Sequence, residues 1–226
     1  SSLNLGAFGG TSTATAVAMT NLHTMMPRVR VLETVAALSN IVGWRNGGGS
    51  SVPWRVGRDA AAPGGFLARM LWGPSTGVSN ATHRAFVGMS SSWSTAPSDV
   101  DPSTRTNFVG MGWDAADANI QFLHNDGSGS ATKIDLGASF PVPTADDTEV
   151  YEVQLYSPND LTQSVSYRVI RYDTTAKTIA AEATGTVTTD LPAVTTLLST
   201  NGCMSVGGTS SVVGVSLFGV LVATEY

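Results

Sequence analysis

Cysteine and lysine are nearly absent from this sequence of 226 residues. Cys203 is the only cysteine, which excludes an intrachain disulfide and a zinc site built from cysteines. Lys133 and Lys177 are the only lysines, and charged residues make up 13% of the chain, against about 25% in an ordinary soluble domain. So few long charged side chains argue against a helix bundle.

The sequence also lacks a long hydrophobic run. The longest apolar stretch, Val212 to Ala223, is interrupted by Gly214, Ser216 and Gly219 and is far shorter than the roughly 20 residues that cross a bilayer. No basic segment followed by an apolar core opens the chain, and the first residue is Ser rather than Met. We therefore expect no membrane insertion, and a fragment or processed chain whose targeting information is missing.

Positive charge is scarce in the second half of the chain. The formal net charge is −5, with eight arginines against four acids in residues 1–113 and four bases against thirteen acids in residues 114–226. An acidic half repels phosphate backbones, and the arginines of the first half are scattered singly. We expect no nucleic-acid partner.

Glycine, serine and threonine are abundant, with 24 glycines and 52 residues of Ser plus Thr. Hydrophobic residues make up 42% of the chain, which is enough to bury a sizeable core and to exclude wholesale disorder. A turn-rich, uncharged chain with a core indicates an all-β protein.

The first 26 residues are small, polar and without a pattern until Pro27. We predict a neck or linker over residues 1–26 and a β-sandwich over residues 27–226. The apolar residues Val31 to Val42 recur at helical spacing, but they are rich in β-branched side chains. Helix and strand are equally compatible with this segment, and we predict a strand.

Short β-branched or aromatic runs alternate with turn clusters along the rest of the chain. The predicted strands are Ser51–Val56, Phe66–Trp72, Ala85–Met89, Asn107–Trp113, Ile120–Leu123, Glu149–Tyr156, Val165–Tyr172, Thr178–Val187 and Val212–Thr224. Apolar and polar residues alternate in the runs that contain Tyr151 and Tyr167, as in sheets with one face on a core. We predict one antiparallel two-sheet β-sandwich of the jelly-roll or concanavalin-like type.

Gly73 to Gly77 match the G-x-S-x-G nucleophile elbow of hydrolases. That elbow requires a strand followed by a turn and a helix, and nothing helical follows in residues 78–80. We interpret the match as a polar loop in a chain rich in glycine and serine.

A metal site is not expected from the histidines, because His23, His83 and His124 are far apart in the sequence. Residues 125–127 read as the turn of a hairpin between residues 121–123 and 134–136. Oxygen-bearing side chains that could hold calcium are Asp114, Asp117, Asn119, Asn125 and Asp126. Their spacing matches no EF-hand loop, so we expect solvated turns and no metal or other cofactor.

All five tryptophans lie between residues 44 and 113. Trp93 stands out because its flanking residues, 90–98, are too polar for a buried strand, and an exposed tryptophan suits sugar stacking. The alternative is a side chain folded back under its own loop. The residues that we expect to bind a ligand are Trp93, Trp54, Trp113, Asn125 and Asp126.

Several segments of the sequence, some about ten residues long, resemble the receptor-binding module of tail fibres in tailed bacteriophages. They include residues 86–89, 96–104, 107–110, 119–129, 131–141, 150–152, 189–192 and 221–226. The resemblance covers roughly residues 20–226 and consists of turns and strands rather than a catalytic signature. It is weakest in the tryptophan-bearing segments Asn46–Val56 and Ser90–Ala96. It implies a lectin-like β-sandwich at the tip of a trimeric fibre, displayed on the virion outside the cell.

We therefore expect a non-enzymatic module that recognises a host cell-surface receptor, in particular a glycan, and is joined to the remainder of the tail fibre. Neutral polar loops with a few aromatics suit polyhydroxylated ligands. A homotrimer is expected because the apolar residues Val17, Met19, Leu22, Met25 and Met26 need covering by neighbouring subunits. Two alternatives remain open: a polysaccharide depolymerase or esterase of the same architecture, and a purely structural virion protein such as a capsid decoration or fibre knob.

Overall fold

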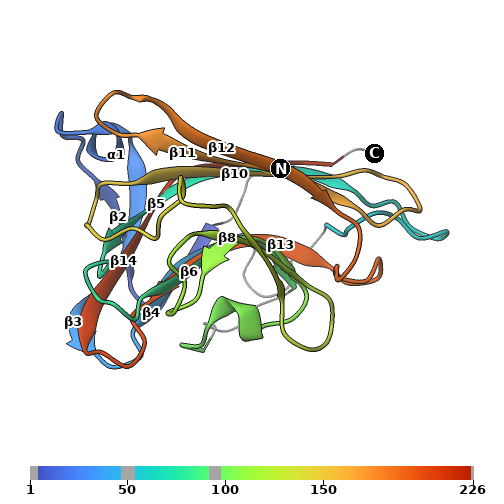
Figure 1. Ribbon diagram of the computed structural model, residues 1–226, viewed down its shortest axis with the longest axis horizontal. Helices are drawn as coiled ribbons and strands as arrows, with labels where there is room; N and C mark the ends of the chain where they lie inside the picture. Colours follow the sequence, from blue (N-terminus) through green and yellow to red (C-terminus); the bar gives the residue numbers. More distant parts are fainter. Residues whose placement is uncertain (1–4, 47–53, 92–97, 225–226) are drawn as a thin grey trace.

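Two antiparallel sheets packed face to face form the protein in a computed structural model that describes residues 5–46, 54–91 and 98–224 (Figure 1). In chain order the elements are β1 (Leu5–Phe8), β2 (Thr11–Thr15), α1 (Leu22–Met25), β3 (Arg28–Ala37), β4 (Ile41–Asn46), β5 (Phe66–Thr76), β6 (Arg84–Ser91), η1 (Pro102–Thr104), β7 (Phe108–Trp113), β8 (Gln121–Asn125), β9 (Thr132–Asp135), β10 (Val150–Ser157), β11 (Val165–Asp173), β12 (Thr178–Val187), β13 (Leu198–Ser205) and β14 (Ser211–Ala223). The predicted two-sheet β-sandwich is confirmed. Within the described ranges, no helix has the length and apolar character needed to span a membrane.

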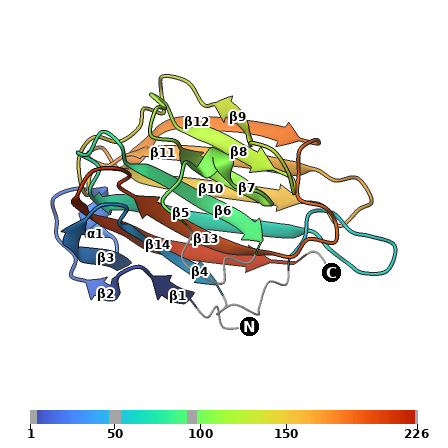
Figure 2. The same ribbon diagram turned by 90° about the horizontal axis from the view of Figure 1, so that it is seen from below.

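Over the residues that the structure describes, each sheet contains seven strands. Sheet A has the order β1-β4-β13-β6-β7-β8-β9, and sheet B has the order β12-β11-β10-β5-β14-β3-β2. Figure 2 shows the strands of both sheets running in roughly the same direction across the molecule. The chain crosses between the sheets repeatedly, for example at the tight turn between β3 and β4, where Ser39 has a positive φ of 61°.

The predicted alternation of apolar and polar residues decides which face of sheet B meets sheet A. Tyr151, Val153 and Leu155 of β10 are fully buried, and their cross-strand partners on β5 are buried as well. The residues between them point to the opposite face of the sheet, since successive side chains of a strand alternate. Each strand predicted from Phe66 onward coincides with an observed strand, and the predicted and observed ends differ by no more than a few residues.

Aromatic side chains connect the two sheets across the core. Trp72 of sheet B stacks on Trp113 of sheet A, with ring centroids 6.0 Å apart and ring planes 18° from parallel. Phe122 of sheet A stacks on Tyr167 of sheet B with a centroid distance of 3.8 Å. Such rings bury large apolar areas, so these two pairs contribute much of the packing between the layers.

A second, smaller apolar cluster lies on the outer face of sheet A. Its buried members are Phe8, Phe86, Phe108, Leu123 and Cys203. Gly88 makes room for the Phe86 ring, because a Cβ atom there would lie 2.8 Å from Cζ of Phe86. The loop that contains η1 packs over this face and is tied to the following hairpin by a hydrogen bond from the Ala131 amide to the Ser103 carbonyl, 2.8 Å long. Sheet A is therefore covered on both sides in this region.

The first part of the segment that we expected to form a neck contains two strands of the sandwich, β1 and β2. β1 pairs with β4 at one edge of sheet A, and β2 pairs with β3 at one edge of sheet B. Four of the five residues of β2 are exposed. An edge strand with little burial needs no apolar alternation, which explains why the sequence shows none.

Other strands were also missed by the sequence prediction. β13 reads Leu-Ser-Thr-Asn-Gly-Cys-Met-Ser and lacks β-branched or aromatic runs, although every residue in it is buried. β9 was missed as well. The strand expected over Val31 to Val42 is confirmed as β3 up to Ala37, but a turn follows it, and β4 was not predicted as a separate strand. The strand expected over Ser51–Val56 lies partly outside the described residues, and its described Trp54 forms an isolated bridge with Leu198.

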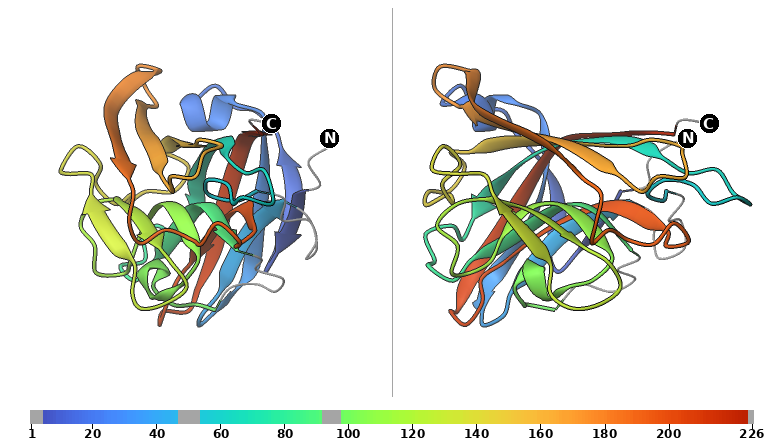
Figure 3. Two further views of the ribbon diagram at one scale, coloured as in Figure 1. Left: turned by 90° about the vertical axis from the view of Figure 1, so that its right-hand side faces the viewer. Right: turned by 45° about the vertical axis from the view of Figure 1, so that its right-hand side comes forward.

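His23 fixes the segment around α1 to the outer face of sheet B. The side chain is fully buried, with Nδ1 2.8 Å from the Glu149 carbonyl oxygen and Nε2 2.9 Å from Oδ1 of Asp147. Its ring meets the edge of Phe218 at a centroid distance of 5.0 Å and rests on Gly73, where a Cβ atom would come within 2.9 Å. Figure 3 shows α1 on the side of sheet B that faces away from sheet A.

We expect His23→Ala to lower the free energy of unfolding by about 2–4 kcal/mol, because it leaves a cavity and removes the partner of Asp147. Burial opposes ionisation of Asp147, yet His23 and the nearby Arg30 and Arg28 together lower the pKa of this carboxyl group. Urea unfolding at pH 7 measures the loss. Thr20→Ala is the matched control, since Thr20 belongs to the same segment and is exposed. Equal stability of the His23 variant and the unsubstituted protein would contradict this account of the docking.

Candidate functional site

The outer faces of the two sheets differ in accessibility. The outer face of sheet A is covered by the second apolar cluster and the η1 loop, and α1 covers one end of sheet B. The rest of the outer face of sheet B carries exposed or half-buried side chains over β12, β11, β10, β5 and the second half of β14, apart from Glu152 and Ile170, which are buried (Figure 1). We call this surface the open face.

Strand register arranges the side chains of the open face in rows across the strands. The central row consists of Leu221, Arg69, Gln154, Arg168 and Thr184, which are successive cross-strand partners on five neighbouring strands. With neighbouring strands 4.7–4.9 Å apart, this row is roughly 19 Å long. The rows on either side are Ala223, Leu67, Tyr156, Ser166 and Thr186, and Gly219, Leu71, Glu152, Ile170 and Glu182.

A hydrogen-bonded cluster around Glu152 lies at the centre of the open face. The carboxylate is 1% exposed and accepts two hydrogen bonds from Arg69, from Nε at 2.6 Å and from Nη2 at 2.8 Å. It also accepts hydrogen bonds from the Tyr172 hydroxyl, at 2.8 Å, and from the Gln154 amide. The bidentate pair fixes the Arg69 guanidinium while about half of that side chain remains exposed.

The charge states of this cluster follow from its contacts. Burial alone would raise the pKa of Glu152, but the hydrogen bonds from Arg69, Gln154 and Tyr172 outweigh it and the pKa lies below its ordinary value. Burial, together with the hydrogen bond to Glu152, raises the pKa of Tyr172 to about 12. At neutral pH Glu152 is therefore an ionised acceptor and Tyr172 a protonated donor.

A second ion pair lies beside the first. Arg168 of β11 donates from Nη2 to Oε2 of Glu182 on β12, at 2.7 Å. The two arginines of the open face are thus each paired with a glutamate, and the four formal charges cancel. The described part of this surface presents polar groups with no net charge.

Two hollows adjoin the central row. The first has a volume of about 220 Å³ and is lined by Arg69, Leu71, Gly219, Val220 and Leu221. The second, of about 150 Å³, is lined by Leu67, Gln154, Leu155, Tyr156, Ser166, Tyr167 and Arg168. A Cβ atom built on Gly219 would meet nothing within 4 Å, so the first hollow exists because this position has no side chain.

Apolar surface borders the polar row. Leu67, Tyr156 and Leu221 are 40%, 38% and 53% exposed, and Leu67 is the direct cross-strand partner of Tyr156. An aromatic ring next to aliphatic surface and fixed hydrogen-bonding groups matches the two kinds of surface that a sugar ring presents. The arrangement is suited to binding a polyhydroxylated ligand.

Those residues expected to bind a ligand that the structure describes, Trp54, Trp113, Asn125 and Asp126, do not come together in one site. Trp113 is fully buried and Trp54 is 8% exposed, and both belong to the core between the sheets. Neither ring is available for stacking on a sugar, because a chain rich in small residues needs its largest side chains inside. Trp93 lies outside the described residues, and its binding role stays a prediction.

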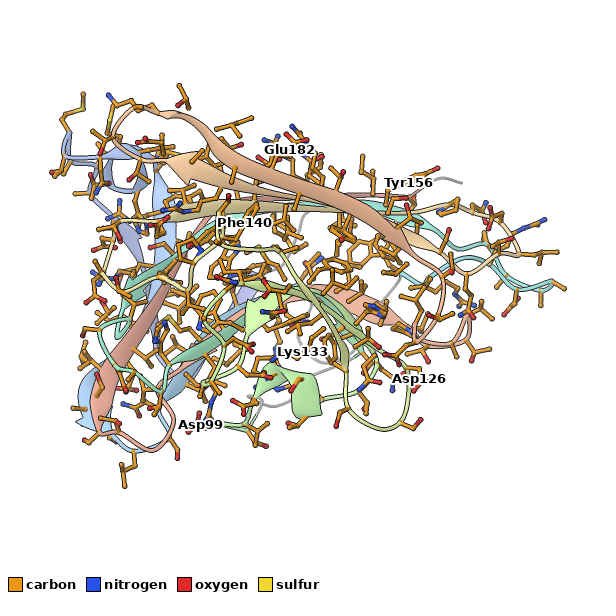
Figure 4. The ribbon with its side chains drawn as sticks, in the orientation of Figure 1. Asp99, Asp126, Lys133, Phe140, Tyr156 and Glu182 are labelled. Atoms are coloured by element: carbon orange, nitrogen blue, oxygen red, sulfur yellow. The ribbon has the colours of Figure 1, made fainter. Side chains whose placement is uncertain are left out.

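Asn125 and Asp126 are placed on the other side of the molecule from the open face. Figure 4 shows Asp126 near the lower side, whereas Glu182 and Tyr156 lie along the upper side. Asn125 is fully buried and donates hydrogen bonds to the carbonyls of Arg105 and Gly129, at 2.6 and 3.2 Å. Asp126 accepts from the Ser128 amide at 2.7 Å. Both stabilise loops, and the predicted hairpin is confirmed by the antiparallel pairing of β8 with β9.

The other sequence candidates also have structural partners. Ser75 of the G-x-S-x-G match is fully buried in β5 and accepts a hydrogen bond from Nε of Arg30 at 3.0 Å, so the strand–turn–helix context of an elbow is missing. Asp114 and Asp117 both bind Nζ of Lys133, at 2.8 and 2.6 Å. The lysine ammonium thus occupies the position between these carboxylates that a cation would need.

A larger hollow, of about 360 Å³, lies between loops at one end of the sandwich. His83 lines it, but Nδ1 of this ring is 2.6 Å from the Asn80 carbonyl oxygen, and the ring packs edge-on against Trp113. Burial lowers the pKa of His83 and keeps the ring neutral. Asp117 also lines this hollow and is paired with Lys133. His83 and Asp117 therefore both have structural partners and hold the loops around the hollow.

The polar residues of the open face were not singled out from the sequence. A signal was present, since Glu152, Gln154 and Arg168 stand between the apolar residues of two predicted amphipathic strands. Alternation places such residues on the outer face of a sheet but does not show whether that face is open or covered. The order of the strands, which brings β5 beside β10, was not readable from the sequence either.

We expect Glu152→Gln to lower the free energy of unfolding by about 1–3 kcal/mol at pH 7, because Arg69 and Tyr172 lose their charged acceptor. A lowered pKa means that the ionised carboxylate stabilises the fold above its ordinary value of 4.5, and that this contribution is lost as the pH falls through the lowered pKa. The difference between the two proteins should therefore shrink below about pH 4.5. Urea unfolding over a pH series measures it.

Glu182→Gln is the control for this experiment, since its pair with Arg168 is solvent-exposed and should change stability little. A difference for Glu152→Gln that stayed constant from pH 7 to pH 3 would show that the carboxylate charge has no role in the cluster.

Solved structures share this fold. No protein-family model and no curated protein sequence matches the chain. The metal-free form of lectin I-B4 from Griffonia simplicifolia superposes with a TM-score of 0.54 at 10% identity, covering 98% of this chain and 93% of the lectin. A legume lectin-like domain from Entamoeba histolytica gives a TM-score of 0.52 at 9% identity, covering 99% of this chain and 91% of that domain. Peanut lectin in complex with a 9-residue peptide gives 0.50 at 11% identity, with both chains covered completely. The chain has a lectin-like β-sandwich fold.

Proposed function

We propose that this chain is a non-catalytic recognition module that binds a glycan on a host cell surface through the open face of sheet B. The observation that supports this most directly is the run of hydrogen-bonding side chains in the central row that lines the two hollows, with Leu221 exposed at its end and Tyr156 exposed beside it. Hydrogen-bonding groups held by their neighbours bind with little loss of side-chain entropy. The lectin-like fold agrees with this assignment.

The state of the carboxylates favours binding over catalysis. Glu152 is ionised and already accepts four hydrogen bonds, from Arg69, Tyr172 and Gln154. A general acid needs a raised pKa, and a nucleophile needs an accessible oxygen; Glu152 has neither. Glu182 is held by Arg168. The open face therefore offers positions for hydrogen bonds rather than a residue ready for proton transfer.

The biological setting that we propose is the tip of a tail fibre of a tailed bacteriophage, exposed on the virion and used for host attachment. This proposal is supported by the sequence segments that resemble the receptor-binding module of phage tail fibres. It is also supported by the sandwich, which leaves one sheet face open to a receptor. The proposed partners are the host glycan, the remainder of the fibre and two further copies of this chain.

Gly219→Leu tests the site. The side chain should fill the hollow between β5 and β14 without a clash, and a leucine in a strand should leave the fold intact. We expect host-cell or glycan-array binding to fall by about tenfold or more, equivalent to about 1.4 kcal/mol. Gly208→Leu is the matched control, because its Cβ position is also open but lies in the turn before β14.

Tyr156→Ala adds an independent test of stacking on the same face. Loss of an exposed aromatic platform should weaken binding by about threefold to tenfold, with little change in melting temperature. Unchanged binding by well-folded Gly219→Leu and Tyr156→Ala proteins would contradict the placement of the site on the open face.

The proposed trimer makes a separate prediction. Val17 and Met19 are 57% and 81% exposed in the single chain, so neighbouring subunits would cover apolar surface there. Light scattering at micromolar concentration should give three times the chain mass of 23.4 kDa. The double variant Val17→Ser, Met19→Ser should shift the mass toward the monomer, whereas Val35→Ser, at another exposed valine, should not. A clean monomer for the unsubstituted chain would overturn the trimer.

A further inference from the structure

We infer that the ligand of the open face is an uncharged oligosaccharide that lies across the strands of sheet B, along the row from Leu221 to Thr184. This inference rests on the proposed function and names the class of glycan that the site accepts. It follows from three properties of the face: how its charges are paired, how long its polar row is, and where its hollows lie.

Pairing of the charges disfavours an anionic ligand. A uronate or sulfate group needs a cation that is free to bind it, and both arginines of the face already hold carboxylates at 2.6–2.8 Å. An anion that approached either guanidinium would also approach the glutamate beside it. Hydroxyl groups have no such conflict, since they both donate and accept and can bond to the outer edges of the ion pairs.

The length of the row indicates several sugar rings. Leu221 and Arg69 line the first hollow, whereas Gln154 and Arg168 line the second. The two hollows therefore lie one after the other along a row of adjacent strands, β14, β5, β10 and β11, with Arg69 of the first and Gln154 of the second as cross-strand partners. A single ring would fill one hollow only, but a linear chain of rings can fill both and bond to the side chains between them.

The borders of the row agree with an uncharged sugar chain. Leu67 and Tyr156 lie in the row on one side, and Leu221 lies at one end. The C–H faces of pyranose rings pack on aromatic and aliphatic groups, while their hydroxyls point sideways. The opposite end, at Thr184 and Thr186 of β12, offers neutral hydroxyl groups.

The experiment compares neutral oligosaccharides of increasing length with matched chains that contain uronate or sulfate groups, using calorimetry on the full chain. We expect neutral chains to bind about tenfold or more tightly than anionic ones, with affinity rising from one ring to several. Affinity for neutral chains should change little between low and high salt, because no net charge is involved. Gly219→Leu should weaken this binding by about tenfold or more.

Glu182→Gln provides a gain-of-function arm. Removal of this carboxylate leaves Arg168 unpaired, so the variant should acquire salt-sensitive binding of anionic chains that the unsubstituted protein lacks. Glu33→Gln makes the same charge change on β3, outside the open face, and should not do so.

The outcomes separate this inference from the proposed function. Preferential binding of anionic chains that is weakened by salt and by Gly219→Leu would overturn the neutral-ligand inference while leaving glycan binding in place. Equal affinity for one ring and for longer chains would overturn the extended site. Failure of every glycan to bind the folded protein would overturn the inference and the proposed function together.

Discussion

The stacking of Trp72 on Trp113 is the contact on which the architecture depends, because it holds sheet B against sheet A at the centre of the molecule. Once these rings and the Phe122–Tyr167 pair face inward, the period of the strands fixes the orientation of the neighbouring residues, except across register shifts such as the one between Leu217 and Gly219 of β14. Glu152, Gln154 and Tyr156 must then point outward from β10, since Tyr151, Val153 and Leu155 point inward. The polar surface of sheet B is thus a consequence of the core.

The outer faces of the two sheets differ in polarity. Sheet A has an apolar outer face around Phe86 and Phe108, which would be unfavourable in water and is buried under a loop. Sheet B has ion pairs and amides on its outer face, which need no cover. Its one covered end is where His23 and α1 dock, so the same segment that closes this end also bounds the open face. The open face is the part of the two outer sheet faces that neither the η1 loop nor α1 covers.

The cluster around Glu152 illustrates how position decides the role of a carboxylate. With a bidentate arginine, a tyrosine and an amide around it, this side chain is ionised at neutral pH, because these hydrogen bonds hold its pKa below the ordinary value. The same surroundings keep Tyr172 protonated. Such a cluster is rigid and electrically balanced, which favours recognition of a ligand by shape and hydrogen bonds over chemical transformation of it.

The sequence by itself determined the fold class and most of the strands, because alternation, turn residues and the scarcity of charge are local properties that need no knowledge of contacts. It did not show that residues 5–15 are edge strands or that β13 is a strand, since exposed edges and small polar residues give no periodic signal. It also favoured tryptophans as binding residues, and Trp113 and Trp54 proved to be core. Only the tertiary structure showed the candidate site, because Arg69 of β5 and Glu152 of β10 are 83 residues apart in the chain and become neighbours through the order of sheet B. Which face of a sheet stays open depends on where loops and α1 pack, and that is a property of the whole fold.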